Sequence, residues 1–549
     1  MGKTLRFFVT VLLIMTMTLP LAAFAEGTRE AVPIPEGDWN VPYPELVQIT
    51  TVKGFGADVV FEGSDDHTSN PWTRAWEEKL GIQVVYEWVV NNANNQYVDK
   101  LNYTIATGVL PDVFKCNYVQ FRQLMEAGLL LDITDYYNNN VSQRIRDYEL
   151  TDPSTIGLTS VDGRIYGIPE YYYGIIDQPK DLWVRKDWYE EAGSPEIKTI
   201  EDFENLARLF MEERGGYGLA IENKLTHLFM TGPMFNVYLG DPANANAQYF
   251  WYEDETGRIK PGIAHAEFRT ALEYWAKWYA EGILSPDFAN MNTDAMVQDM
   301  VIGKAGLNPH WQWQGWHVGP DLVAAQGSAN AYMIPLPFPT IDGSQVLGQI
   351  GFPNNNIIVV SKDCANPAAV MKLLSFTDYI MFDPNSEMTE EEFKGYTDGQ
   401  REHVPGSVEI IDPMADMLQF EHVLHALKSG DTSELFTAGM KKKYSDSIAW
   451  LTEKNTGGLG AYLQQGFDGC AYDRSKFLID NGFLKVTDAW GPAPEELDQT
   501  VNTVDILLNG VMEIIMGVQP LDYYDTVLAE WYAQGGQIME DAINAIYGD

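Results

Sequence analysis

The chain has 549 residues, of which 45% are hydrophobic and 12% aromatic, and its formal net charge is −42 at pH 7. This apolar content excludes a disordered chain, and the length favours two domains over one. The negative charge argues against nucleic acid or an anionic membrane as a partner, because both are polyanions.

The N-terminus has the features of an export signal. Lys3 and Arg6 precede an apolar stretch at residues 7–22, which is shorter than the roughly 20 residues of a membrane-spanning helix. Ala23 and Ala25 then form the pattern that signal peptidase recognises. We therefore predict a removed signal peptide at residues 1–25 and a periplasmic, extracytoplasmic protein. No cysteine stands at the cleavage point, so no lipid anchor is expected.

The next segments alternate between strand and helix patterns. Residues 26–45 are rich in proline and are predicted to form an extended tether. Strands are then expected at 47–51, 82–88 and 112–114, with helices at 72–80, closed by Gly81, and at 97–107. This β-α-β-α-β order predicts a parallel sheet covered by helices, an α/β fold.

Later segments show the same alternation of strand and helix patterns. Thr199 is expected to cap a helix that runs to Gly215, and residues 357–360 form a continuous apolar strand, as in a parallel sheet buried on both faces. A helix is predicted at 367–375 with Asn366 as its N-cap. Three cysteines, Cys116, Cys364 and Cys470, leave open one bridge plus one free thiol.

Loops after parallel strands are where ligands gather in open α/β sheets. This rule places residues 54–56 and 115–117, including Lys115 and Asn117, at a ligand cleft. The loop containing Asn354 is a weaker candidate, because it enters its strand instead of leaving one.

Several strings carry a family resemblance. G-V-L-P-D-V at 108–113, G-L-L-L-D-I-T at 128–134 and D-G-R-I-Y-G-I-P at 162–169 resemble segments of extracellular solute-binding proteins of family 1. Further matching strings stand at 182–203 and 282–288, and the ending at 521–547 resembles the family's terminal helices. In this order the strings cover most of the chain, and the most similar branch is that of oligosaccharide-binding receptors.

The resemblance implies a periplasmic-binding-protein fold of type II, with a ligand cleft between two lobes joined by a hinge. It implies a monomeric receptor of an ABC importer that captures a mono- or oligosaccharide and delivers it to permease subunits, without catalysis or cofactor. The branch's acidic calcium loop is not matched at residues 211–218, so no metal is expected. The predicted division is 46–175 and 350–440 for the N-lobe, and 176–349 and 441–549 for the C-lobe with the C-terminal helices.

Sugar sites combine flat aromatic rings with hydrogen-bonding groups. Trp311, Trp313 and Trp316 form the densest such cluster in the chain, and on an extended segment Trp311 and Trp313 would point the same way. The alternative is that these tryptophans belong to a lobe core.

Other candidates are polar or tyrosine-rich. Tyr171, Tyr172 and Tyr173 precede the expected crossover between lobes, although a run of tyrosines is equally compatible with strand packing. Arg185 is a candidate hydrogen-bond donor, or else it pairs with surface carboxylates.

The competing function is an exported glycoside hydrolase or polysaccharide lyase. A hydrolase requires two positioned carboxylates, and 78 acidic residues do not exclude such a pair. However, the sequence contains no H-E-x-x-H, G-x-S-x-G or P-loop motif. His422 and His425 share a helical face without a nearby third ligand and are interpreted as structural.

Overall fold

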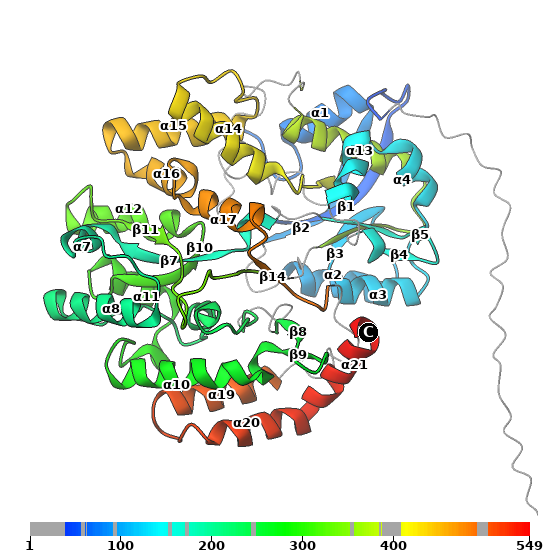
Figure 1. Ribbon diagram of the computed structural model, residues 1–549. Coiled ribbons are helices and arrows are strands. Elements are labelled where there is room, and N and C mark those ends of the chain that lie inside the picture. Colours follow the sequence, from blue (N-terminus) through cyan, green and yellow to red (C-terminus); the bar gives the residue numbers. More distant parts are fainter. Residues whose placement is uncertain are drawn as a thin grey trace, which may run out of the picture.

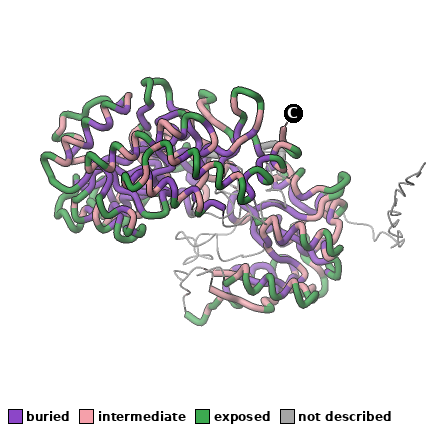
Figure 2. The backbone as a smooth tube through the Cα atoms, turned by 90° about the horizontal axis from the view of Figure 1, so that it is seen from below, coloured by how far each residue is buried: buried purple, intermediate pink, exposed green. Residues whose placement is uncertain are grey.

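The computed structural model describes residues 39–55, 61, 63–91, 96–151, 156–170, 175–242, 249–351, 356–383, 386, 408–490 and 503–548. These residues form two lobes, each with its own β-sheet and covering helices (Figure 1). Buried segments gather inside a larger and a smaller body (Figure 2). The predicted two-lobed α/β class is confirmed.

The first lobe is built on a five-stranded sheet in the order β2-β1-β3-β13-β6. Its strands are β1 (Val47–Phe55), β2 (Ile82–Asn91), β3 (Val113–Cys116), β6 (Gly167–Pro169) and β13 (Ile357–Val360). β1, β2 and β3 are parallel, as predicted, but β13 runs antiparallel to both β3 and β6. The sheet is therefore mixed. β13 begins at the edge of the sheet where β6 ends.

Local sequence signals fix the first helix. In α1 (Pro71–Leu80), the Asn70 side chain accepts hydrogen bonds from the amides of Trp72 and Thr73, and Gly81 ends the helix with φ 67°. A Cβ at Gly81 would lie 2.7 Å from the Tyr43 carbonyl oxygen, so only glycine fits this turn.

Helices pack against the first sheet around two apolar clusters, one that includes Trp72, Trp76 and Tyr137 and one that includes Leu101 and Phe121. They are α1, α2 (Gln96–Thr107), α3 (Tyr118–Glu126), α4 (Thr134–Asn140), α5 (Gln143–Thr151) and α13 (Pro367–Phe382). α13 begins at Pro367 as predicted, although the Asn366 side chain makes no capping hydrogen bond.

The described end of the proline-rich segment lies against this lobe. The Tyr43 amide donates to the Leu80 carbonyl oxygen at 2.8 Å, and Lys372 Nζ donates to the Val41 carbonyl oxygen at 2.6 Å. Residues 39–45 therefore dock on the first lobe.

The second lobe has a three-stranded antiparallel sheet in the order β10-β7-β11. The strands are β7 (Lys180–Arg185), β10 (Leu307–Trp311) and β11 (Met333–Leu336). Its helices include α7 (Lys186–Glu191), α8 (Ile200–Arg214), α9 (Thr226–Phe229), α10 (Ala266–Ala280), α11 (Thr293–Val301) and α12 (Gln314–Gln326). Thr199 caps α8 as predicted, in a reciprocal capping box with Asp202.

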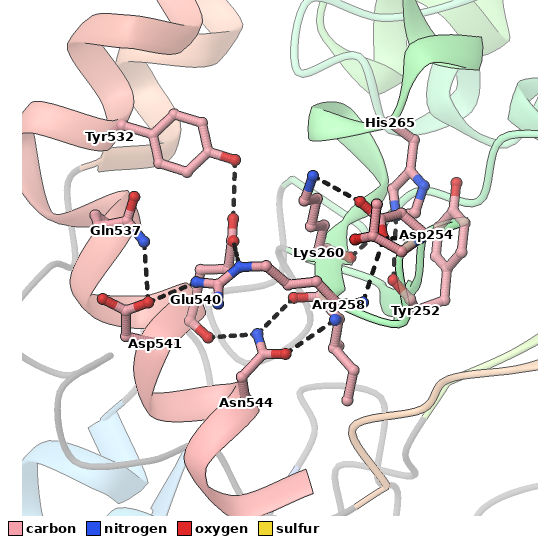
Figure 3. Close-up of polar contacts among 12 residues, drawn as sticks. Tyr252, Asp254, Arg258, Lys260, His265, Tyr532, Gln537, Glu540, Asp541 and Asn544 are labelled. Atoms are coloured by element: carbon pink, nitrogen blue, oxygen red, sulfur yellow. Dashed lines mark hydrogen bonds and ion pairs between the residues drawn. The ribbon is translucent and has the colours of Figure 1, made fainter. Parts of the chain in front are cut away.

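The chain ends in three helices, α19 (Thr503–Ile515), α20 (Tyr523–Trp531) and α21 (Gln537–Tyr547). α21 is held to the hairpin of β8 (Trp251–Glu253) and β9 (Ile259–Pro261) by Arg258, which bonds Glu540 and Asp541 (Figure 3). Asn544 adds hydrogen bonds to the backbone of Ile259 at 3.0 and 2.8 Å. The last helix is thus fixed to the second lobe by side chains from across the sequence.

Two crossing segments connect the lobes, and hydrogen bonds join their described ends. At the first lobe, the Glu170 amide donates to the Asn356 carbonyl oxygen at 2.8 Å. At the second, the Gly351 amide donates to the Gln178 side chain at 2.7 Å. The two crossings are therefore joined to each other at both of their described ends.

A group of helices bridges both lobes: α14 (Ala415–Ser429), α15 (Ala438–Glu453), α16 (Leu459–Gln465) and α17 (Ala471–Asp480). On one side Arg144 of the first lobe bonds Asp412, just before α14, at 2.6 Å. On the other, Arg474 of α17 bonds Asp181 of β7 at 2.7 Å.

Across the described ranges, no helix has both the length and the apolar character needed to cross a membrane. The three cysteines are free and buried.

Candidate ligand-binding site

The tryptophan-rich segment forms an aromatic pair at the end of β10. Trp311 is the last residue of that strand, and Trp313 immediately precedes α12. Their rings are stacked, with centroids 5.7 Å apart and an interplanar angle of 9°. Trp313 is 38% exposed and Trp311 is partly buried. The pair therefore offers a flat apolar surface of the kind on which a sugar ring can stack.

Trp316 lies apart from this pair, one turn into α12. Its ring is covered by the Lys443 ammonium, 3.9 Å from the ring centroid, and packs directly on Gly460 of α16. A Cβ at Gly460 would lie 2.4 Å from the Trp316 ring, so this contact requires glycine. Trp316 thus joins α12 to the bridging helices.

Buried histidines support the aromatic pair. The His310 ring lies 4.2 Å from Trp313 and 5.2 Å from His227, centroid to centroid. His310 Nδ1 donates to the Trp311 carbonyl oxygen at 3.1 Å, and burial holds the pKa of His310 well below 6.5. His227 bonds the buried carboxylate of Glu222 through Nδ1. A neutral imidazole therefore packs edge-to-face against Trp313 and helps to hold its ring in place.

A lysine and an aspartate flank the pair. Lys180 lies directly opposite Trp311 in the register of β7 and β10. Burial lowers the pKa of Lys180 to about 8, and the charge of Asp241 opposes this shift. Asp241 accepts a hydrogen bond from the Thr226 hydroxyl at 2.8 Å. Neither residue was a sequence-based candidate, because only strand pairing brings Lys180 to Trp311 and only the return of a distant loop brings Asp241 near Lys180.

The first lobe contributes a charged cluster at one edge of its sheet. Lys115, at the end of β3, bonds Glu170, just past β6, and lies 3.8 Å from the carboxylate of Glu409. Asn356 Nδ2 donates to Glu170 at 3.0 Å. Burial lowers the pKa of Lys53, near the end of β1, to about 8.

The reversed direction of β13 explains this cluster. Because β13 is antiparallel to β3, Ile357 lies opposite Cys116 and also opposite Pro169 of β6. Asn356, which precedes β13, therefore lies at the edge where β3 and β6 end.

The crossing segment links the two groups. Asp177, in the short helix Ile175–Asp177, accepts hydrogen bonds from Gln312 at 3.0 Å and from the Tyr472 hydroxyl at 2.7 Å. Gln312 lies between the two stacked tryptophans in sequence. Asp177 lies seven positions after Glu170, so their Cα atoms are at most about 25 Å apart. A ligand of several sugar rings could contact both groups.

The remaining sequence candidates have other surroundings. Asn117 caps α3 by accepting from the Gln120 amide at 2.9 Å. Arg185 is 2% exposed, bonds Asp187 and stacks over Trp188. It stands at the opposite end of β7 from Lys180, roughly 17 Å along the strand. The structure therefore does not bring Arg185 to Trp311.

Four candidates, Tyr171, Tyr172, Tyr173 and Asn354, lie outside the described residues. Within the described part of the chain, no group of three or more histidine, cysteine or acidic side chains could hold a metal ion.

Comparison with known proteins defines the class. The family model of bacterial extracellular solute-binding proteins matches residues 65–377, more than half of the chain. The chain belongs to this family.

Two curated relatives come from Bacillus subtilis strain 168. The lipoprotein LipO is 27% identical over 252 residues, which cover 43% of this chain and 46% of LipO. The polygalacturonan/rhamnogalacturonan-binding protein YtcQ is 25% identical over 263 residues, which cover 44% of this chain and 47% of YtcQ. Each match spans about half the length of the relative.

The similarity to solved structures extends over nearly the whole chain. The crystal structure of the alginate-binding protein AlgQ2 without calcium ion has a TM-score of 0.60 and 15% identity, covering 92% of this chain and 99% of that one. At this identity the likeness shows a common fold.

Proposed function

We propose that the protein is the extracytoplasmic receptor of an ABC importer that captures an oligosaccharide between its lobes and delivers it to a membrane permease. The observation that carries this proposal is the stacked Trp311–Trp313 pair, which lies beside the crossing segment through the Gln312–Asp177 hydrogen bond. Closure follows if the ligand contacts both lobes only in the closed state.

Other observations support the sugar ligand. The aromatic pair lies beside Lys180, and the first lobe has the Lys115–Glu170 ion pair at one edge of its sheet, so stacking and polar groups are combined as a sugar requires. The names of the relatives YtcQ and AlgQ2 refer to binding of polysaccharides. They favour a receptor over the alternative of an exported hydrolase or lyase.

We further propose that residues 1–25 are a signal peptide, that the mature protein acts as a monomer without lipid anchor, and that the sugar is bound without conversion. In this view, residues 46–175 and 350–440 belong mainly to the N-lobe. Residues 176–349 and 441–549 belong mainly to the C-lobe.

A ligand screen tests this function. Purified residues 26–549 would be titrated with neutral and uronic-acid oligosaccharides, followed by thermal shift and calorimetry. We expect a saturable rise in Tm, since ligand binding to the folded state stabilises it, and intact sugar after recovery. Shortened sugar would indicate a hydrolase or lyase, and no response to any glycan would contradict the sugar ligand.

A further inference from the structure

Lys180 is placed to reach the same ligand as the tryptophan pair. It is the first residue of β7 and faces Trp311 across the antiparallel pair with β10. Side chains directly opposite one another in such a pair project to the same face, with Cβ atoms about 4.5–5.5 Å apart. On its other side, β7 is paired with β11 only as far as Leu182. The Lys180 side chain therefore extends beyond the edge of β11 next to the indole of Trp311.

The Lys180 ammonium has no direct partner among the residues that the structure describes. It makes no side-chain hydrogen bond there and no ion pair within 4.0 Å, and its nearest influential acid is Asp241. Asp241 is itself engaged by the Thr226 hydroxyl. The chain has 78 acidic and 36 basic residues. With so many carboxylates, a lysine with a purely structural role would be expected to have a carboxylate partner.

The other charged groups around this position are already paired. Asp181, the next residue of β7, points to the opposite face and bonds Arg474. On α9, His227 is bonded to Glu222, and on β10 His310 is buried beside it. Among the residues that the structure describes, the charge left for a ligand beside Trp311 is therefore the positive charge of Lys180, whose acidic neighbour is Asp241.

We propose that the captured sugar carries a carboxylate, and that Lys180 is the residue that recognises this carboxylate while Trp311 and Trp313 hold the apolar face of the sugar. This inference rests on the proposed function. Its physical basis is that a partly buried ammonium is costly without a counter-charge, and a ligand carboxylate supplies that charge through a charge-assisted hydrogen bond. A uronic acid and a sialic acid offer the same group.

Calorimetry with matched ligands and matched variants tests the inference. The probes are trigalacturonate, its carboxyl-reduced neutral counterpart and 3′-sialyllactose, each titrated at pH 7.0 into residues 26–549. For the sugar acid that binds, Lys180→Gln is expected to weaken affinity about 10- to 100-fold, the range of a hydrogen bond to a charged group. Lys180→Arg keeps the charge and is expected to retain most of the affinity.

The control is Lys304→Gln. Lys304 is exposed on the second lobe, bonds Asp299 at 2.9 Å and precedes the far end of β10, so its loss is expected to leave affinity unchanged. Circular dichroism and Tm of each variant establish that it is folded. The neutral counterpart is expected to bind more weakly than the sugar acid and to be insensitive to Lys180→Gln.

Proton linkage gives a readout that a structural role would not produce. Because the pKa of Lys180 is lowered to about 8 in the free protein, a bound carboxylate would raise it, and the complex takes up protons. Affinity for the sugar acid should therefore fall between pH 7 and 9.5 in the wild type, and the fall should be clearly smaller in Lys180→Gln, where Lys53 of the first lobe still titrates near pH 8.

The outcomes separate the two proposals. Binding of trigalacturonate or 3′-sialyllactose with the expected loss in Lys180→Gln supports the inference and tells the two sugar acids apart. Binding of neutral sugars alone, or equal affinity in wild type and Lys180→Gln, overturns the inference but leaves the sugar receptor standing. Failure of every acidic and neutral glycan to bind overturns both.

Discussion

At the scale of single residues, the candidate site is defined by how two indoles are held. Trp313 is exposed enough to meet a ligand, yet its position is set by the stacked ring of Trp311 and by the edge-to-face ring of His310. His310 is fully buried and hydrogen-bonded to the Trp311 carbonyl oxygen. A preformed aromatic surface loses little conformational freedom on binding, which favours affinity.

Replacing Trp313 by alanine should weaken sugar binding. If about 80 Å² of apolar surface leaves water on stacking, at about 25 cal/mol/Å² the loss is about 2 kcal/mol, or about 30-fold in Kd. Isothermal calorimetry with the ligand found in the screen measures this. Phe477→Ala, which removes a 50% exposed aromatic ring of α17, is the matched control and should bind normally. Equal affinity in wild type and Trp313→Ala would show that the tryptophan pair is not part of the binding site.

At the scale of elements, the last helix shows how distant segments are joined. α21 meets the β8–β9 hairpin through Arg258, which lies between the buried carboxylate of Glu540 and the exposed one of Asp541 (Figure 3). The Tyr532 hydroxyl also donates to Glu540 at 2.8 Å. Glu540 is 2% exposed, so its charge depends on these partners.

Arg258→Ala should destabilise the protein by about 2–4 kcal/mol, because it leaves the Glu540 carboxylate buried without its cation. Urea unfolding followed by tryptophan fluorescence gives this difference. Arg269→Ala is the comparison, since Arg269 bonds Asp522 and Asp525, whose side chains are 86% and 76% exposed, and its loss should cost less than about 1 kcal/mol. Similar losses of unfolding free energy in both variants would show that the buried ion pair is not what holds α21.

At the scale of the whole molecule, the two lobes are joined by paired crossing segments and by the bridging helices α14–α17. The crossings are tied at each end, by Glu170 to Asn356 and by Gln178 to Gly351. At the second lobe, burial and the neighbouring Asp416 raise the pKa of Asp177 well above its usual value, and the Tyr472 hydroxyl bonds both carboxylates. The described ends of the crossings are therefore fixed in place on each lobe.

Ligand binding should reduce the radius of gyration, because a ligand that touches both lobes favours the closed arrangement. Small-angle X-ray scattering with and without saturating ligand measures the change, and Trp313→Ala at the same sugar concentration should show a smaller one. An unchanged radius at a saturation verified by calorimetry would mean that capture does not close the lobes.

The sequence by itself determined the local structure and the class of fold. Capping residues such as Thr199 and Asn70, the left-handed glycine at Gly81 and the alternation of apolar residues act over a few neighbours, so α1, α8, β1 and β2 are found where the patterns predict them. The sequence placed Trp311 and Trp313 close together, but their stacking also depends on the turn between β10 and α12.

Only the tertiary structure decided what lies beside those local features. The antiparallel entry of β13, the burial of Arg185 and the position of Lys180 opposite Trp311 depend on contacts between residues far apart in sequence. Whether a lysine beside a strand faces water, a carboxylate or a ligand is set by those long-range partners, and no local pattern encodes them.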